Sequence, residues 1–243
     1  MFFEKENTKS HQGYDHYIFF NEKKSHLRDG HKNSALFSLL KKSKTHKIKT
    51  RQIIARQSEI VVNHYIVKEG VIRLVKHLSD GRRQVLGFSL PGDLIGQHFR
   101  EHWPFDIEAV TAVTAYKIPK KSMDSIITEH PKISLSLYKT TAHELDLYHE
   151  HIIRLTSTTA EEKICRFLLD LRTRWHAIKA EDPMFIPMPM TRQDVADYLG
   201  LTFETVSRIL NRLQKKAIIE IFSNGIEIIN VGFFEKYQIE NPH

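Results

Sequence analysis

Residues 191–215 constrain the fold more than any other stretch, because they predict two short helices joined by a tight turn. Thr191, with Asp194 three residues later, resembles a capping box that begins the first helix. Gly200 can adopt the left-handed conformation that ends this helix. Thr202 can then cap a second helix, whose apolar positions recur at helical spacing. These apolar positions are Phe203, Val206, Ile209, Leu210 and Leu213. The pattern predicts a helix-turn-helix, and the alternative is an ordinary helical hairpin.

The second predicted helix carries polar side chains on its other face. Glu204, Ser207 and Arg208 lie in its first two turns, where a recognition helix contacts base edges in the major groove. Arginine can bind guanine bidentately, a carboxylate can accept a hydrogen bond from cytosine, and a small hydroxyl can meet thymine. We therefore predict that these three residues read DNA bases, and we assign phosphate contacts to four further residues. The phosphate contacts are Arg192, Thr202, Arg212 and Lys215.

This stretch resembles the DNA-binding motif of the CRP/FNR family of bacterial transcription regulators. Glu204, Ser207 and Arg208 match the E-x-x-S-R pattern of its FNR and FixK branch. The resemblance implies palindromic DNA with TTGAT-like half-sites, in which Arg208 reads the G·C pair and the other two residues contact neighbouring pairs. The similarity extends from about Ile48 to Tyr237, and the helix-turn-helix is its most specific part.

Length and composition exclude several classes of protein. A chain of 243 residues can bury a real core and suggests one large or two modest domains. It has no run of about 18 apolar residues, and its start lacks an apolar segment after the charges, so we expect neither a membrane span nor a signal peptide. The single cysteine excludes an intrachain disulfide, and a cytoplasmic location is expected.

The net charge of +7 is unevenly distributed along the chain. Residues 1–50 contain 11 Lys and Arg against 5 Asp and Glu, whereas residues 156–243 contain 11 against 12. The segment predicted to bind DNA is therefore not basic on average, and its phosphate contacts have to come from a few focused groups. Bulk charge is weak evidence for DNA binding in this chain, and the motif is strong evidence.

Residues 1–33 are polar and show no sustained hydrophobic period, so we predict a flexible basic arm. The arm is rich in histidine, but the spacing of these residues matches no common ligand pattern, and we predict no metal site. Its histidines include His11, His16, His26 and His31. A short helix is predicted over residues 35–42.

Residues 34–130 predict a β-rich domain. Between Lys47 and Pro119, short runs of β-branched residues alternate with turn signals, a spacing that predicts an antiparallel barrel or roll. The turn signals are Glu69-Gly70, Asp80-Gly81 and Pro91-Gly92. This stretch also resembles the β-roll sensor domain of the same family, which in some members binds cyclic AMP.

No cofactor is predicted for this roll. Cyclic-nucleotide-binding members hold the phosphate with backbone amides and with an Arg followed by Ser or Thr. No such pair follows Gly96 here, and Trp103-Pro104 lies near the expected position, so a buried phosphodiester would lack its cationic partner. FNR-like sensors instead carry an iron–sulfur cluster, which needs about four thiolates. One cysteine cannot supply them, and nothing in the sequence points to a haem.

That cysteine, Cys165, lies on a predicted apolar helix face with Ile164 and Phe167. One interpretation is a buried structural thiol. The other is a redox-responsive thiol, whose pKa the adjacent Lys163 and Arg166 could lower if the thiol is exposed.

Residues 131–156 predict a long helix with an apolar seam. The seam positions are spaced 3-4-3-4-3, a heptad pattern suited to a parallel contact between two helices. The seam consists of Tyr138, Thr141, Leu145, Tyr148, Ile152 and Leu155. The alternative is packing against the chain's own roll, for which Ile133, Leu137 and Leu147 are available. The match to the family's dimerisation helix favours a homodimer.

Residues 157–243 predict the DNA-binding domain. A helix begins after Thr156 and continues through Trp175, and proline-rich residues 177–190 connect it to the helix-turn-helix. Beyond that motif, Ser223-Asn224-Gly225 lies between two alternating strands and predicts a hairpin. A helix-turn-helix followed by a hairpin is a winged arrangement.

Together these features predict an α+β chain with an N-terminal antiparallel β-roll of the cyclic-nucleotide-binding type, a dimerisation helix and a C-terminal winged helix-turn-helix. We predict a homodimeric, FixK/FnrN-like transcription activator that lacks the iron–sulfur cysteines of FNR and has double-stranded DNA and RNA polymerase as partners. The resemblance implies control of genes for low-oxygen respiration. The first alternative is a regulator gated by redox chemistry or by a small molecule in the roll. The second, an enzyme, has little support, because the sequence contains no P-loop, G-x-S-x-G or H-E-x-x-H motif.

Overall fold

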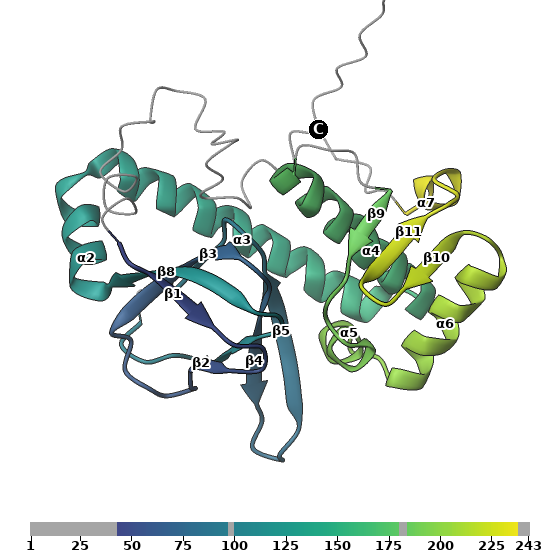
Figure 1. The fold of residues 1–243 in the computed structure, drawn as a ribbon, viewed down its shortest axis with the longest axis horizontal. Coiled ribbons are helices and arrows are strands. Elements are labelled where there is room, and N and C mark those ends of the chain that lie inside the picture. Colours follow the sequence, from purple (N-terminus) through teal and green to yellow (C-terminus); the bar gives the residue numbers. More distant parts are fainter. Residues whose placement is uncertain (1–42, 97–99, 180–183, 238–243) are drawn as a thin grey trace, which may run out of the picture.

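The computed structural model describes residues 43–96, 100–179 and 184–237, which form a β-roll, a long helix and a smaller helical half (Figure 1). The predicted basic arm over 1–33 and the predicted helix over 35–42 lie outside these described residues. None of the described helices combines the length and the hydropathy needed to cross a membrane.

The N-terminal half is an antiparallel roll of two four-stranded sheets, as the strand spacing predicts. Its strands are β1 (Thr45–Ile48), β2 (Ile53–Ala55), β3 (Asn63–Glu69), β4 (Ile72–His77), β5 (Arg83–Ser89), β6 (Leu94–Ile95), β7 (Asp106–Ala109) and β8 (Val113–Pro119). One sheet has the order β1-β8-β3-β6 and the other the order β2-β7-β4-β5. The predicted turn at Gly70 joins β3 to β4 with a φ of 88°, a left-handed conformation that glycine adopts without a steric penalty.

The two faces of the second sheet have different neighbours. Ile72 and Ile107 point into the roll and belong to its internal hydrophobic cluster. Val75 and Val85, which face each other across β4 and β5, belong instead to the cluster that includes the C-terminal helices. Because side chains alternate between the faces of a strand, one sheet can serve both the roll and the DNA-binding half.

Three helices follow the roll: α2 (Lys120–Glu129), α3 (Pro131–Ser157) and α4 (Ala160–Lys179). The long helix predicted over 131–156 is therefore present. Leu137 is buried and Ile133 packs with it against a cluster that includes Ile66 and Leu94 of the roll. One side of α3 thus covers the roll, while Tyr138, Leu145, Tyr148 and Ile152 of the predicted seam are exposed.

The C-terminal half contains the predicted helix-turn-helix and hairpin. Its elements are β9 (Phe185–Pro187), α5 (Arg192–Leu199), α6 (Phe203–Lys215), β10 (Ile219–Phe222), β11 (Gly225–Ile228) and α7 (Gly232–Glu235). The prediction that residues 177–190 only connect α4 to the helix-turn-helix is wrong in two respects. Helix α4 continues to Lys179, and β9 pairs with β11 to extend the hairpin to a three-stranded sheet.

The addition of β9 explains the glycine of the predicted Asn-Gly turn. Ser223 and Asn224 form the turn, and Gly225 already pairs with Phe222 as the first residue of β11. A Cβ at Gly225 would lie 2.4 Å from the carbonyl oxygen of Ile186 and 2.5 Å from the ring of Phe185. Glycine is therefore needed there for the close approach of β9 rather than for the turn.

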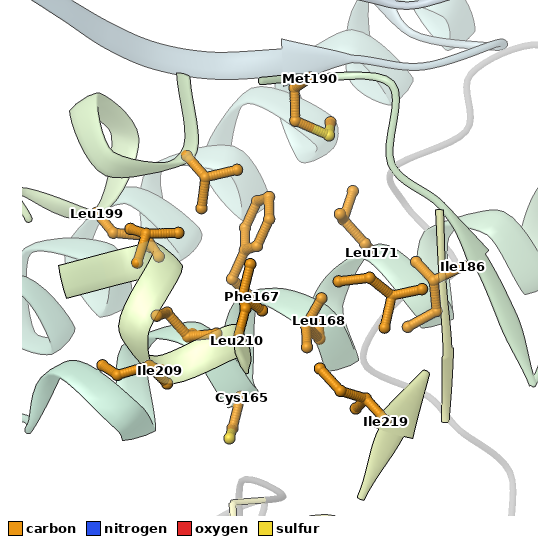
Figure 2. Packing of buried hydrophobic residues seen from close by; sticks show 14 of the residues in the cluster. Cys165, Phe167, Leu168, Leu171, Ile186, Met190, Leu199, Ile209, Leu210 and Ile219 are labelled. Carbon is orange, nitrogen blue, oxygen red and sulfur yellow. The ribbon is translucent and has the colours of Figure 1, made fainter. Parts of the chain in front are cut away.

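A single hydrophobic cluster joins the roll to the DNA-binding half. Val85 and Phe88 of β5 pack in the same cluster as Phe167 of α4 and Leu210 of α6. Figure 2 shows the C-terminal part of this cluster, to which α4 contributes Phe167 and Leu168 and α6 contributes Leu210. The helix-turn-helix therefore packs on the roll in this conformation.

Candidate nucleic-acid interface

The caps of the helix-turn-helix form as the sequence predicts. The Asp194 amide donates to Thr191 Oγ1 at 3.1 Å, and the Thr191 amide donates to Asp194 Oδ2 at 3.1 Å, which completes the capping box of α5. Gly200 ends α5 with a φ of 62°. Thr202 Oγ1 accepts a hydrogen bond from the Thr205 amide at 3.2 Å and so caps α6. Local chemistry therefore fixes the entry angle of the recognition helix.

The apolar face of α6 is buried at four of the five predicted positions. These four are Val206, Ile209, Leu210 and Leu213. Phe203 departs from the prediction, since 44% of its surface is exposed. As the first residue of α6, it lies at the end of the helix, where fewer neighbouring elements cover it.

The predicted base-reading residues differ in their surroundings. Glu204 and Arg208 are exposed and lie one turn apart, on the same face of α6. Ser207 is half-buried, and its hydroxyl oxygen is covered and has no hydrogen-bond partner among the described residues. A buried unpaired hydroxyl costs about 1–3 kcal/mol. The hydroxyl is not accessible to a base in this conformation, and its base-reading role stays a prediction.

The four residues assigned to DNA phosphates also differ. Lys215 is exposed, Arg192 is half-buried and Thr202 is committed to its cap. Arg212 forms an ion pair with Glu161 of α4. Burial alone would raise the pKa of Glu161, but a hydrogen bond from the Tyr237 hydroxyl and the charge of Arg212 hold that pKa below its ordinary value. Arg212 therefore serves the packing of α6 on α4 in this structure, and its phosphate contact stays a prediction.

An ionic contact that the sequence does not reveal holds the helix-turn-helix against the roll. Arg73 of β4 donates from Nη1 to both carboxylate oxygens of Asp194, at 2.9 and 3.0 Å. Arg83 of β5 pairs with the same carboxylate and reaches Asp197 at 3.3 Å. Figure 1 shows α5, which carries both aspartates, between β5 and α6. We call this group of four residues the roll–α5 contact.

Asp194 is the centre of the roll–α5 contact, and only 1% of its surface is exposed. Burial alone would raise its pKa, but hydrogen bonds from Thr191 and Arg83 and the charge of Arg73 outweigh burial and lower the pKa below its ordinary value. The carboxylate is therefore charged at neutral pH. It caps α5 and binds the roll at the same time.

A second ion pair supports the same arrangement from α4. Arg174 pairs with Asp93 in the turn after β5 and donates to the carbonyl of Phe88 at 3.0 Å. Asp93 also accepts from the Leu90 amide at 2.8 Å, and burial raises its pKa against the opposing charge of Arg174. The turn at Gly92-Asp93 therefore has a structural role here.

Cys165 lies in the core of the C-terminal half, with 0% of its surface exposed (Figure 2). Burial, with the negative charge of Glu161, raises the pKa of its thiol to about 12. The redox interpretation requires an exposed thiol, and the thiol of Cys165 is buried in this conformation. The structure favours the interpretation of Cys165 as a buried structural thiol.

This environment predicts slow thiol chemistry in the folded protein. At pH 8, a thiol with a pKa of about 12 is ionised in about one molecule in 10⁴. Labelling of Cys165 by a chromogenic disulfide reagent should therefore become fast only when denaturant unfolds the chain. Complete labelling of the native protein within minutes would contradict the buried-thiol interpretation.

Comparison with known proteins identifies the family. Residues 162–237 match the Crp-like helix-turn-helix domain, and residues 45–130 match the cyclic nucleotide-binding domain. The chain is 38% identical over 179 residues to the nitrogen fixation regulation protein FixK of Bradyrhizobium diazoefficiens, covering 74% of this chain and 75% of that protein. The chain belongs to the CRP/FNR family.

Two further relatives agree with this assignment. This CRP/FNR protein is 32% identical to the transcriptional activatory protein AadR of Rhodopseudomonas palustris over 185 residues, 76% of this chain and 77% of that protein. Its fold matches the structure of FixK2 from Bradyrhizobium japonicum with a TM-score of 0.75 and 28% identity, covering 82% of this chain and 99% of that chain. The protein is therefore a DNA-binding transcription regulator rather than an enzyme.

Proposed function

We propose that this CRP/FNR protein is a FixK-like transcription activator that binds palindromic DNA with TTGAT-like half-sites as a homodimer. The observation that carries the proposal is the recognition helix α6, which buries four apolar residues and exposes Glu204 and Arg208 in its first two turns. The similarity to AadR, a transcriptional activatory protein, supports activation, and the similarity to FixK supports a regulatory role. As the resemblance to the FNR and FixK branch implies, we extend the proposal to control of low-oxygen-type genes in the cytoplasm, with RNA polymerase as the partner.

The exposed seam of α3 supports the homodimer. Tyr138, Leu145 and Ile152 are exposed large apolar residues at heptad spacing, on a helix whose other side covers the roll. Pairing two such seams removes apolar surface from water and sets two helices parallel. A symmetric dimer then presents two recognition helices to half-sites about 34 Å apart, one turn of DNA.

The interior of the roll supports activity without a cyclic nucleotide. Trp103 is buried among aromatic side chains, with ring centroids 6.5 Å from Tyr65 and 6.4 Å from Phe105. In a cyclic-nucleotide-binding roll, the arginine that holds the phosphate is expected near this position. An indole that packs on other rings offers an anion no compensating charge.

A cavity of about 670 Å³ supports a second candidate function, a regulator gated by a small molecule. The cavity lies between the β4–β5 hairpin, α3 and the turn at Gly200, and it combines an apolar wall with cationic groups. Its lining includes Leu86, Phe105 and Leu155 together with Lys76, Arg100 and His151. Such a lining suits an anion with an apolar body.

Operator binding by the purified, reduced protein without added ligand separates these two functions. The probe is a labelled TTGAT–N4–ATCAA duplex, competed with scrambled DNA at fixed salt. Tight and selective binding would support the effector-independent activator. Selective binding that requires a small-molecule fraction of cell extract would favour the gated regulator, and binding without selectivity in either condition would overturn the half-site assignment.

Replacing Arg208 by alanine should weaken operator binding by about 1–3 kcal/mol and relax the preference at one base pair. The reason is the loss of a bidentate contact to guanine in the major groove. Fluorescence anisotropy with duplexes that vary the G·C pair of each half-site measures both effects.

The matched control is Arg192→Ala, which should weaken binding about equally for all duplexes because a phosphate carries no sequence information. An Arg208→Ala variant that keeps the wild-type ratio of operator to scrambled affinity would show that Arg208 does not read a base.

A further inference from the structure

Three side chains on the outer face of the β4–β7 sheet bring one imidazole nitrogen and two carboxylates within 4.8 Å of one another. His77 ends β4, and Asp106 and Glu108 lie two residues apart on β7, so both carboxylates project from the same face. From this geometry we propose that His77, Asp106 and Glu108 form a binding site for a divalent first-row transition metal ion.

The distances between the donor atoms suit a common ion. His77 Nε2 lies 3.3 Å from Asp106 Oδ2. Two ligands that each lie about 2.1 Å from one ion stand about 3.0–3.4 Å apart in octahedral or tetrahedral geometry. The imidazole and the Asp106 carboxylate can therefore bind one ion with little movement.

The existing contacts of both carboxylates leave an oxygen for the ion. Arg73 reaches Glu108 from Nε and Nη2, both at 2.7 Å, and both contacts fall on Oε2. The Gln57 amide donates to Oδ1 of Asp106 at 2.6 Å. Glu108 Oε1 and Asp106 Oδ2 are thus the oxygens that would bind the ion. Contacts of this kind orient metal ligands from outside the first coordination sphere.

The charge balance of this region also favours a cation. Only 5% of the surface of Asp106 is exposed, and its partners within the described part of the chain are the Gln57 amide and the His77 ring. A buried carboxylate without a full positive charge is costly unless it coordinates a metal. The wider group carries two more formal negative charges than positive ones. It consists of Asp106, Glu108, Asp194 and Asp197 with Arg73 and Arg83.

The chemical types of the three ligands indicate which ions the site would bind. A histidine nitrogen disfavours Mg²⁺ and Ca²⁺, which prefer oxygen ligands, and the two carboxylates fit ions from Mn²⁺ to Zn²⁺. Three protein ligands leave coordination positions for water, so the site is open rather than a closed structural zinc site. The ligands come from two strands about thirty residues apart, which explains why their spacing in the sequence matches no metal motif.

Zn²⁺ titration of the metal-free, full-length protein against a chromogenic chelator tests the proposal. His77→Ala should lower the affinity of one Zn²⁺ site by about 10-fold or more, because replacing even a residue that only supports a metal ligand typically costs about 10–100-fold in metal affinity. Co²⁺ bound to the wild type should show visible ligand-field bands that weaken in this variant. Zn²⁺ should also raise the Tm of the wild type more than that of His77→Ala, because an ion that binds only the folded state stabilises it.

The matched control is His102→Ala, which removes another exposed histidine of the roll that is not among the proposed ligands. Equal Zn²⁺ affinity and stoichiometry for His77→Ala, His102→Ala and the wild type would overturn the site, since binding would then come from other histidines. Glu108→Gln provides a second variant that keeps the size of the side chain. Circular dichroism tests whether each metal-free variant folds. None of these measurements depends on DNA binding, so their outcome is independent of the proposed function.

An ordinary polar contact between His77 and Asp106 is the competing explanation for the geometry. It requires no metal, so it predicts that wild type and His77→Ala respond alike to Zn²⁺ and Co²⁺. That result would assign His77 and Asp106 to an ordinary polar contact and end the proposal.

Discussion

Replacing Asp194 by alanine should lower the free energy of unfolding by about 3 kcal/mol, because the change leaves two half-buried guanidinium groups short of a partner. Arg73 and Arg83 both converge on this carboxylate. The substitution also removes the capping box of α5, which on its own contributes about 1 kcal/mol. Since Arg73 keeps Glu108 and Arg83 keeps Asp197, the loss should fall at the lower end of the range for broken buried pairs.

Urea unfolding monitored by tryptophan fluorescence measures this loss. Asp80→Ala is a control for removal of an aspartate, since Asp80 pairs with Arg82 on the exposed tip of the same roll and should leave the midpoint unchanged. An Asp194→Ala midpoint equal to that of Asp80→Ala would show that the roll–α5 contact does not stabilise the fold.

The same contact has a predicted pH dependence. The pKa of Asp194 in the folded chain lies below its ordinary value of 3.8, so its contribution is fully present above that pH. The contribution is lost as the pH falls through the folded-state pKa. The difference in stability between the wild type and Asp194→Ala should therefore shrink in acid below about pH 4.

Replacing Ile152 by glutamate should convert the protein to a monomer and weaken binding to the two-half-site operator by about 10²–10⁴-fold, because the second half-site is then no longer bound at high effective concentration. In a symmetric dimer, one substitution places two like charges in the same apolar seam, where neither has a partner. Sedimentation gives the mass, and anisotropy with the duplex gives the affinity.

Ile153→Glu is a closely matched control. Ile152 and Ile153 are exposed to similar extents in the single chain, 58% and 61%, but only Ile152 occupies a seam position. We expect Ile153→Glu to remain dimeric and to bind the operator. If both variants were monomeric, or if neither were, the heptad seam would not be the dimer contact.

Local chemistry made much of the DNA-binding half predictable. The capping box at Thr191, the left-handed Gly200 and the cap at Thr202 each depend on residues a few positions apart, and the structure confirms all three. The period of α6 likewise predicts its buried face, except at Phe203. The heptad pattern predicts the exposed seam of α3, although the dimer itself stays a proposal.

Contacts between distant segments decided the rest. Strand β9 forms because β11 offers it a free edge, and the need for Gly225 follows from that approach. The sequence pattern left the state of Cys165 open, and the packing of α4 in the core of the C-terminal half buries the thiol. Ser207 shows the same dependence, because its position on α6 is predictable but the covering of its hydroxyl is not.

The sequence by itself therefore determined the family, the two halves of the chain and the residues on α6 that face solvent. The family follows from the resemblance of the helix-turn-helix, and the other two features follow from hydrogen bonds and periodicities that span a few residues. Only the tertiary structure decided how the halves are held together, since Arg73 and Asp194 are 121 residues apart and meet through the pairing of β4 with β5 and the packing of α5 on β5. The pairing of β4 with β7 likewise places His77 beside Asp106, which no local pattern in either strand predicts.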